Sequence, residues 1–168
     1  MDAYRSIANR AGVFNEIEHR ARRAVGDHTK KRPDIWLCAN GVDIISDVAI
    51  TTPSAIAASK GADRQELWCA AITEQSKIMK YKDVAAAHGR RIIPFVAESF
   101  GAFGLQLRSV INLLSQHWHR SAHANDASFA YRARQSIAIA IQRGNARVVD
   151  VAVSIARSDS LQRARYAA

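Results

Sequence analysis

The chain has 168 residues with a formal net charge of +9, and 48% of its residues are hydrophobic. This length suits one globular domain, and the surplus of arginine and lysine indicates a polyanionic partner, most naturally nucleic acid, although acidic protein surfaces are an alternative. Two cysteines exclude a disulfide framework. No apolar run reaches the roughly 18 residues of a membrane span, and no signal-peptide core is present, which predicts an intracellular protein, nuclear or cytoplasmic and not secreted.

The N-terminal segment carries apolar side chains at helical spacing, which predicts an amphipathic helix over residues 3–25. The loop that follows this helix contains the consecutive basic residues Lys30, Lys31 and Arg32. Their positive charge is suited to a phosphate backbone, and the alternative is that it neutralises nearby carboxylates.

A hairpin is predicted around Asn40-Gly41, the dipeptide typical of a two-residue turn between two apolar runs. If Ala39 faces Val42, the residue numbers of every cross-strand pair sum to 81. Asp34 and Asp47 are then direct neighbours, with Cβ atoms roughly 4.5–5.5 Å apart. Alternation along the strands places both aspartates on one face and the core on the other, which holds Ile35, Leu37, Val42, Ile44, Val48 and Ile50.

Two carboxylates this close destabilise a sheet unless a positive charge lies between them. A divalent cation with oxygen ligands, most plausibly Mg²⁺, supplies that charge. The alternative is that Asp34 only begins a strand and that Asp47 faces solvent.

The rest of the chain is predicted to be mainly helical around one further strand. His88-Gly89 is typical of a helix C-terminus, Pro94 requires a strand edge or a bulge, and Gly144 is a candidate break in the last helix. The predicted elements are a helix over about 63–87, a strand over 91–98, and helices over 105–118 and about 126–157.

The middle helix places Lys77 and Tyr81 on one face with Glu74, and Lys80 lies about 60° to the side of Lys77. A lysine beside an attacking water orients the nucleophile and stabilises charge on a scissile phosphate. The alternative is a solvated helix face with an ion pair between Glu74 and Lys77.

Together, Pro33-Asp34, twelve intervening residues, Asp47-Val48 and a helical Lys77-x-x-Lys80-Tyr81 before a strand resemble the PD-(D/E)XK nuclease core. More narrowly, residues 30–105 resemble the restriction-enzyme-like endonuclease at the C-terminal end of site-specific non-LTR retrotransposon polyproteins. The resemblance implies an α+β fold in which a small mixed sheet with a β-hairpin is flanked by helices. It further implies one endonuclease-like domain over residues 1–168, with a restriction-endonuclease-like core over about 1–105 and a helical C-terminal extension over about 105–168.

By this resemblance Asp34 and Asp47 hold the metal, and Lys77 is the active-site lysine, with Lys80 as the substitute candidate. Tyr81 would support the site.

The resemblance also leaves two questions about ligands and lysine open. Glu16 or Glu18 on the first helix could add a metal ligand, and nothing local selects between them. A lysine usually stands two residues after the second acid, where this chain has Ala49. The lysine therefore comes from the helix, or the domain has lost catalysis and kept DNA binding.

The resemblance thus implies a metal-dependent DNA endonuclease that hydrolyses phosphodiester bonds with Mg²⁺, for which Mn²⁺ can substitute, and it points to a mobile-element origin. Its expected partners are DNA and a reverse transcriptase or other mobile-element protein. One alternative is a catalytically inactive, nuclease-like nucleic-acid-binding module. The other is a structural interaction protein, which is favoured if an apolar stripe on the last helix is exposed, formed by Ile137, Ile141, Val148, Val151 and Ile155.

Overall fold

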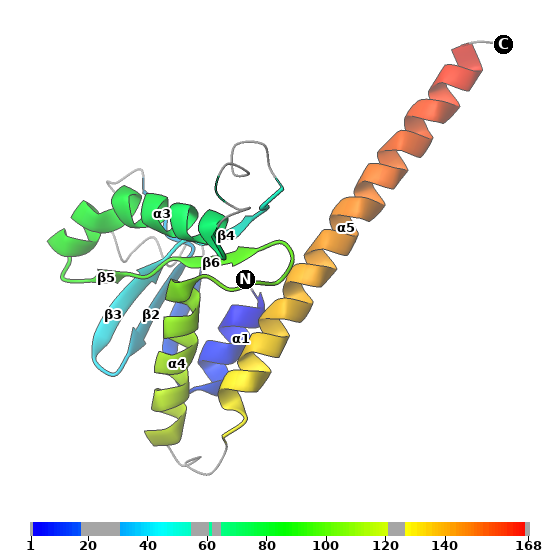
Figure 1. Ribbon diagram of the computed structural model, residues 1–168. Coiled ribbons are helices and arrows are strands. Elements are labelled where there is room, and N and C mark those ends of the chain that lie inside the picture. Colours follow the sequence, from blue (N-terminus) through cyan, green and yellow to red (C-terminus); the bar gives the residue numbers. More distant parts are fainter. Residues whose placement is uncertain (1, 18–30, 55–60, 62–64, 121–126, 167–168) are drawn as a thin grey trace.

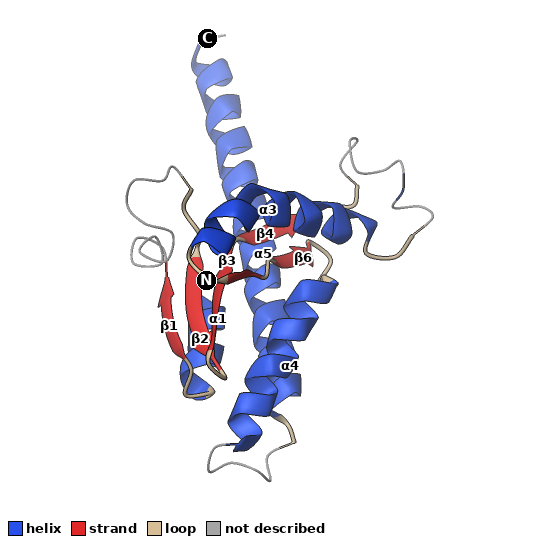
Figure 2. Cartoon of the chain, turned by 90° about the vertical axis from the view of Figure 1, so that its left-hand side faces the viewer, coloured by secondary structure: helices blue, strands red, loops and turns tan. Residues whose placement is uncertain are grey.

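A small mixed sheet lies between helix α3 on one face and helices α1, α4 and α5 on the other in the computed structural model (Figures 1 and 2). The structure describes residues 2–17, 31–54, 61, 65–120 and 127–166. Its elements are α1 (Asp2–Arg10), β1 (Phe14–Ile17), β2 (Ile35–Ala39), β3 (Val42–Ser46), β4 (Val48–Thr51), α3 (Trp68–Ala87), β5 (Arg91–Ile92), β6 (Phe95–Glu98), α4 (Leu105–Arg120) and α5 (Phe129–Tyr166).

The predicted hairpin is confirmed in its register. Strands β2 and β3 pair antiparallel from Ala39 opposite Val42 to Ile35 opposite Ser46, so each pair of residue numbers sums to 81. Asn40 and Gly41 form the turn with φ values of 53° and 73°, the left-handed conformation that Asn and Gly adopt at low cost. Strand β1 pairs antiparallel with the other edge of β2.

The sheet is interrupted at Asp47 and Pro94. Strand β3 pairs parallel with β5, and β4 pairs parallel with β6, with Ile45 opposite Ile92 and Val48 opposite Phe95 in one unbroken register. Pro94 falls opposite Asp47 in this register, and the Ile93 and Phe95 N–H groups on either side of it donate to the Ile45 and Asp47 carbonyls. An N–H at position 94 would point to the other side, where β5 and β6 pair with no further strand among the described residues. The prediction that Pro94 lies at an edge or bulge is therefore confirmed.

The prediction of a helix over residues 3–25 is confirmed only for its first part. Helix α1 ends at Arg10, Gly12 has a left-handed φ of 69°, and Phe14–Ile17 form an edge strand instead. Phe14 and Ile17 fit the spacing of a helix, but pairing with β2 outweighs this local preference. Residues 18–25 of the predicted helix lie outside the described part of the chain.

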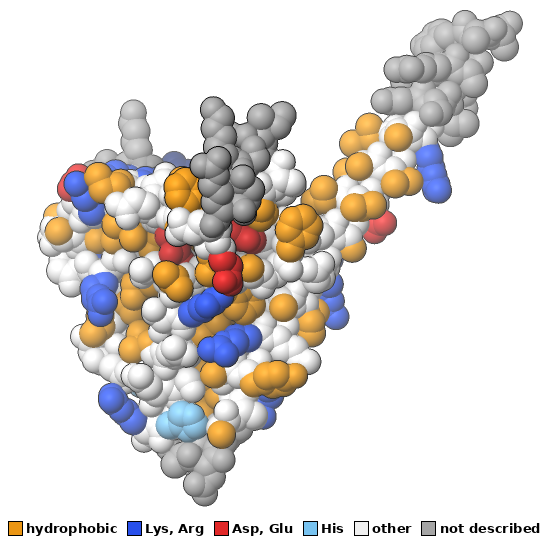
Figure 3. All heavy atoms as spheres, in the orientation of Figure 1, with side chains coloured by type: hydrophobic (Ala, Val, Ile, Leu, Met, Phe, Trp, Pro, Cys, Tyr) orange, Lys and Arg blue, Asp and Glu red, His pale blue; other side chains and the backbone are white. Residues whose placement is uncertain are grey.

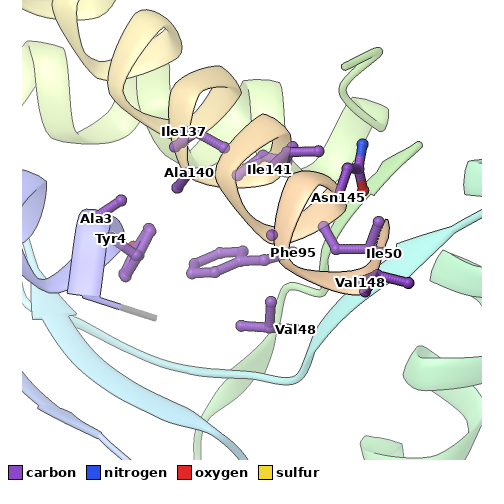
Figure 4. A pocket seen from close by; sticks show the side chains of 12 residues that line it. Ala3, Tyr4, Val48, Ile50, Phe95, Ile137, Ala140, Ile141, Asn145 and Val148 are labelled. Carbon is purple, nitrogen blue, oxygen red and sulfur yellow. The ribbon is translucent and has the colours of Figure 1, made fainter. Parts of the chain in front are cut away.

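Apolar side chains cover both faces of the sheet, which corrects the prediction of one core face. Ile35, Leu37 and Ile44 are fully buried in the cluster shared with α1, α4 and α5. Ile45, predicted on the opposite face, is fully buried under α3, whereas Ile50, predicted in the core, is 51% exposed. The crossover helix α3 explains the burial of Ile45, because it covers the second face of the sheet. Ile50 lies on the other side, where it lines a cavity with residues of α5 (Figure 4).

Helix α3 has an unusual beginning and a regular end. Its N-cap residue Leu67 is left-handed with φ 60° and offers no side-chain cap, and the carboxylate of Glu98 accepts a 3.4 Å hydrogen bond from the Ala70 N–H. At its end the N–H groups of Gly89 and Arg90 donate to the carbonyls of Ala86 and Ala85. This Schellman arrangement confirms the predicted C-terminus at His88-Gly89.

Glu74 joins α3 to the beginning of α4. Its Oε1 accepts a 2.9 Å hydrogen bond from the Gln106 N–H, and Gly104 leaves room for it, since any Cβ at that position would collide with the carboxylate. Glu74 is 6% exposed, and burial raises its pKa although hydrogen bonds from the Gln106 and Leu107 N–H groups act in the opposite direction. This contact helps to fix the helix that carries Lys77.

We expect Glu74→Gln to remove a pH dependence of stability. The folded-state pKa of Glu74 is raised above the unfolded value of about 4.3, so the folded protein holds this proton more tightly. Its contribution is most favourable at low pH and is lost as the pH rises through the raised pKa. Urea denaturation from about pH 4 to pH 8 should show the wild type losing free energy of unfolding relative to Glu74→Gln.

The matched control for this measurement is Glu66→Gln, which changes an exposed glutamate in the loop before α3. Its free energy of unfolding should follow that of the wild type across the range. Parallel curves for the wild type and Glu74→Gln would contradict the prediction.

Helix α5 is continuous over 38 residues, so the predicted break at Gly144 is wrong. Its first half packs against α1 and α4, and its second half projects from the body of the protein (Figure 1). A glycine costs a helix only about 1 kcal/mol, which the packing before it outweighs. Among the described helices, none is both long and apolar enough to cross a membrane.

Candidate active site

Asp34 and Asp47 meet where the hairpin ends, as its register predicts. Asp34 precedes β2, and its N–H donates a 2.9 Å hydrogen bond to the Ser46 carbonyl, which carries the pairing one step beyond Ile35. Its Oδ2 accepts a 2.7 Å hydrogen bond from the Val48 N–H. Asp47 lies in the break between β3 and β4, so both carboxylates come from ends of strands.

Two lysines of α3 reach Asp47. The Nζ atoms of Lys77 and Lys80 lie 2.7 and 3.3 Å from Asp47 Oδ2. The Asp47 side chain is 7% exposed, while those of Lys77 and Lys80 are 25% and 49% exposed. Lys77 therefore makes the shorter and less solvated contact, and its ion pair is with Asp47 instead of with Glu74, the partner that the alternative required.

Tyr81 fastens α3 to the chain just before Asp34. Its hydroxyl donates a 2.7 Å hydrogen bond to the Arg32 carbonyl, and its side chain is fully buried beside Ile45 and Ala85. Pro33, the residue between Arg32 and Asp34, is also fully buried. Tyr81 thus sets the position of the strand that carries the first acid.

The two acids differ in their protonation. Burial raises the pKa of Asp34, and Asp47 adds to the rise, while the Val48 N–H opposes it. Burial acts on Asp47 in the same direction, but contacts with Lys77 outweigh it and lower the pKa of Asp47. As the pH falls, Asp34 is therefore the acid that takes up a proton first.

Glu16 lies on β1, which corrects its predicted place on a helix. It faces Trp36 across the strands, so it shares a sheet face with Asp34 and is its diagonal neighbour, at about 7–8 Å between Cα atoms. Its Oε2 is buried and has no hydrogen-bond partner in the described part of the chain. Glu18, the other candidate ligand, lies outside the described residues.

The structure thus brings together Asp34, Asp47, Lys77, Lys80 and Tyr81, and it places Glu16 diagonally across from Asp34 on the same sheet face. Among the residues that the structure describes, no group of three or more His, Cys, Asp and Glu side chains is placed to hold a metal. Two carboxylates nevertheless fit Mg²⁺, which is commonly held by one or two of them together with water and substrate phosphate.

The predicted basic loop is described in part. Lys31 is half-buried and Arg32 is exposed, and Pro33 separates Arg32 from Asp34. Lys30 lies outside the described residues. The hydrogen bond from Tyr81 holds only the Arg32 carbonyl, which leaves the guanidinium group at the surface.

Sequence reasoning missed the contacts made by the backbone around the site. The Val48 N–H orients Asp34, and the Ser46 hydroxyl donates a 2.5 Å hydrogen bond to the Ile93 carbonyl beside the sheet break. Main-chain donors carry no side-chain signal. The one available clue was Pro94, a residue that sheets tolerate only at an edge or bulge and that falls opposite Asp47 in the register.

No protein-family model matches the chain, and no curated protein matches it in sequence.

Proposed function

We propose that the protein is a metal-dependent DNA endonuclease of the PD-(D/E)XK type, with a restriction-endonuclease-like core. One observation carries the proposal: Asp34, Asp47 and Lys77 converge from three separate elements at one end of the sheet. Placing the buried Asp47 next to the half-buried Asp34 and a lysine costs stability, and such clusters with shifted pKa values are typical of functional sites.

Each residue has a role in phosphodiester hydrolysis. Asp34 and Asp47 would hold Mg²⁺, or Mn²⁺ in its place, and the bound ion would supply positive charge for the phosphate and lower the pKa of water. Lys77 stabilises the negative charge that develops on the scissile phosphate, and its contact with Asp47 orients its ammonium group. Lys80 stands beside it as the more exposed substitute.

The other residues predicted for the site would hold the strand that carries Asp34 in place or increase affinity for DNA. Tyr81 holds the strand that carries Asp34 through the Arg32 carbonyl. Lys30, Lys31 and Arg32 would contact the DNA backbone, which gives salt-sensitive affinity that does not depend on base sequence.

A catalytically inactive nucleic-acid-binding module is the second candidate, and a specific contact favours it. Lys77 and Lys80 both contact Asp47, so their positive charges balance the two carboxylates without a cation. Such a module would keep the basic surface and its affinity for DNA.

The proposed origin rests on the resemblance of residues 30–105 to endonucleases of non-LTR retrotransposons. A reverse transcriptase or another mobile-element protein is accordingly the proposed protein partner, with DNA as the substrate.

Incubation of the purified chain with supercoiled plasmid tests the proposal. We expect nicked or linear DNA in the presence of Mg²⁺ or Mn²⁺ and none when EDTA removes the metal. Absence of cleavage under all metal conditions, with DNA binding that weakens as salt rises, would favour the binding module and overturn the nuclease.

A further inference from the structure

Two lysines contact one oxygen atom of Asp47. Lys77 Nζ lies 2.7 Å from Asp47 Oδ2, a length typical of a charge-assisted hydrogen bond, whereas Lys80 Nζ lies 3.3 Å from the same atom. A hydrogen bond weakens as it lengthens, so the contact of Lys80 is the weaker of the two. Asp47 therefore has one close cationic partner and one loose one.

Lys80 is also the lysine that solvent reaches more easily. Its side chain is 49% exposed, while that of Lys77 is 25% exposed. An ion pair with so exposed a partner adds little stability, because water solvates the ammonium group nearly as well as the carboxylate does. The Lys80 Nζ further lies 4.6 Å from the centre of the Tyr81 ring, and such a cation–π contact is weak at an exposed site. Lys80 can therefore leave Asp47 at little cost in free energy.

We propose that Lys80 competes with the divalent cation for Asp47 and turns toward solvent when the cation binds. The inference rests on the proposed function, because it requires Asp34 and Asp47 to be the ligands. Mg²⁺ lies about 2.0–2.1 Å from a carboxylate oxygen, so a cation on either oxygen of Asp47 would come within a few ångströms of both ammonium groups. Repulsion between these charges favours the removal of one lysine. Lys77 stays, because its contact is shorter and less solvated.

The competition links the cation to DNA. Once it has turned outward, the Lys80 ammonium group is available to a phosphate group. Lysine and arginine side chains are spread over the face of the molecule shown in Figure 3, and the net charge is +9, so the phosphates of nucleic acid are the anions that this protein is best suited to meet. By linkage, a phosphate that holds Lys80 away from Asp47 would strengthen cation binding.

Isothermal titration calorimetry of the whole chain with MnCl₂, without DNA, measures the competition. We expect Lys80→Met to bind Mn²⁺ with a dissociation constant about tenfold lower than that of the wild type, because the competing charge is absent. The matched control is Lys82→Met, which removes the charge of another exposed lysine of α3 that lies about 200° around the helix from Lys80. At about 0.15 M salt such a distant charge is screened, so this variant should bind as the wild type does. Thermal unfolding checks that both variants are folded.

Chemical labelling shows which lysine moves. Acetic anhydride acetylates exposed amines, and mass spectrometry measures the rate at each lysine. We expect addition of Mg²⁺ to the wild type to speed the acetylation of Lys80 more than that of Lys77, with Lys82 unchanged as the internal reference. Equal acceleration at both lysines, or a greater acceleration at Lys77, would overturn the assignment of Lys80 as the lysine that leaves.

The outcomes distinguish this inference from the proposed function. Mn²⁺ binding that is present in the wild type, lost in Asp47→Asn and unchanged or weaker in Lys80→Met would keep the metal site and overturn the competition. Absence of Mn²⁺ binding in both the wild type and Lys80→Met would overturn the proposed function and this inference together. Binding by Lys80→Met alone would support the competition, since the lysine would then exclude the cation from the wild type.

Discussion

Asp47→Asn and Asp34→Asn are each expected to abolish detectable metal-dependent cleavage of plasmid DNA. Asparagine keeps the shape of the side chain but removes the negative charge that would hold the metal. Charge stabilisation by a metal is worth several kcal/mol, which corresponds to a loss of about 10³-fold in rate. The rate of conversion of supercoiled to nicked plasmid at saturating Mg²⁺ measures the effect.

Asp43→Asn is the matched control for both variants. Asp43 lies on β3 near the turn, and its carboxylate lies 3.7 Å from Arg90 rather than beside the lysines. It should cleave at the wild-type rate. All three variants should bind DNA in a gel-shift assay, because each removes one negative charge from a basic protein.

Retained cleavage in Asp47→Asn would contradict the nuclease assignment, whereas equal loss in Asp43→Asn would indicate a general effect on the fold. Thermal unfolding of each variant separates these outcomes. Removal of Asp47 also leaves Lys77 and Lys80 without their shared acid, so some loss of stability is expected there.

Lys77→Met is expected to reduce cleavage by about 10²–10³-fold, the effect of removing one donor that stabilises transition-state charge. Methionine keeps the length and the apolar stem of the side chain while it removes the ammonium group. Rates should be measured at saturating DNA, so that weaker binding does not enter the comparison.

Lys80→Met is the matched control, because it removes an ammonium group from the residue three positions after Lys77 on the same helix. Lys80 is twice as exposed as Lys77 and lies farther from Asp47, at 3.3 Å against 2.7 Å, so we expect a loss of less than about tenfold. A larger loss in Lys80→Met than in Lys77→Met would exchange the roles of the two lysines. Equal and small losses would support the inactive binding module.

Much of the candidate site was predictable because local rules place it. The Asn40-Gly41 turn fixes the hairpin register, and the register alone brings Asp34 and Asp47 to the same place. Helical spacing similarly placed Lys77 and Tyr81 on one surface. What the spacing left open was whether that surface faced the acids, which depends on how the crossover between β4 and β5 packs α3 on the sheet.

The errors fall where tertiary contacts override local preference. Residues 14–17 have helical periodicity, yet they form β1 because the free edge of β2 offers hydrogen bonds that a helix at that point would leave unused. Gly144 remains helical because packing of α5 on α1 and α4 outweighs its weak propensity. The burial of Ile45 likewise depends on α3, which covers its face of the sheet, whereas Ile50 lines a cavity on the α5 side.

The sequence by itself determined the basic charge, the hairpin register and the neighbouring acids, since each depends on residues that are close along the chain. Only the tertiary structure decided that Lys77, not Lys80, makes the closer contact with Asp47, that Glu16 comes from a strand, and that half of α5 projects. These features depend on packing between distant segments, where small differences in free energy select one arrangement among several that satisfy the same local pattern.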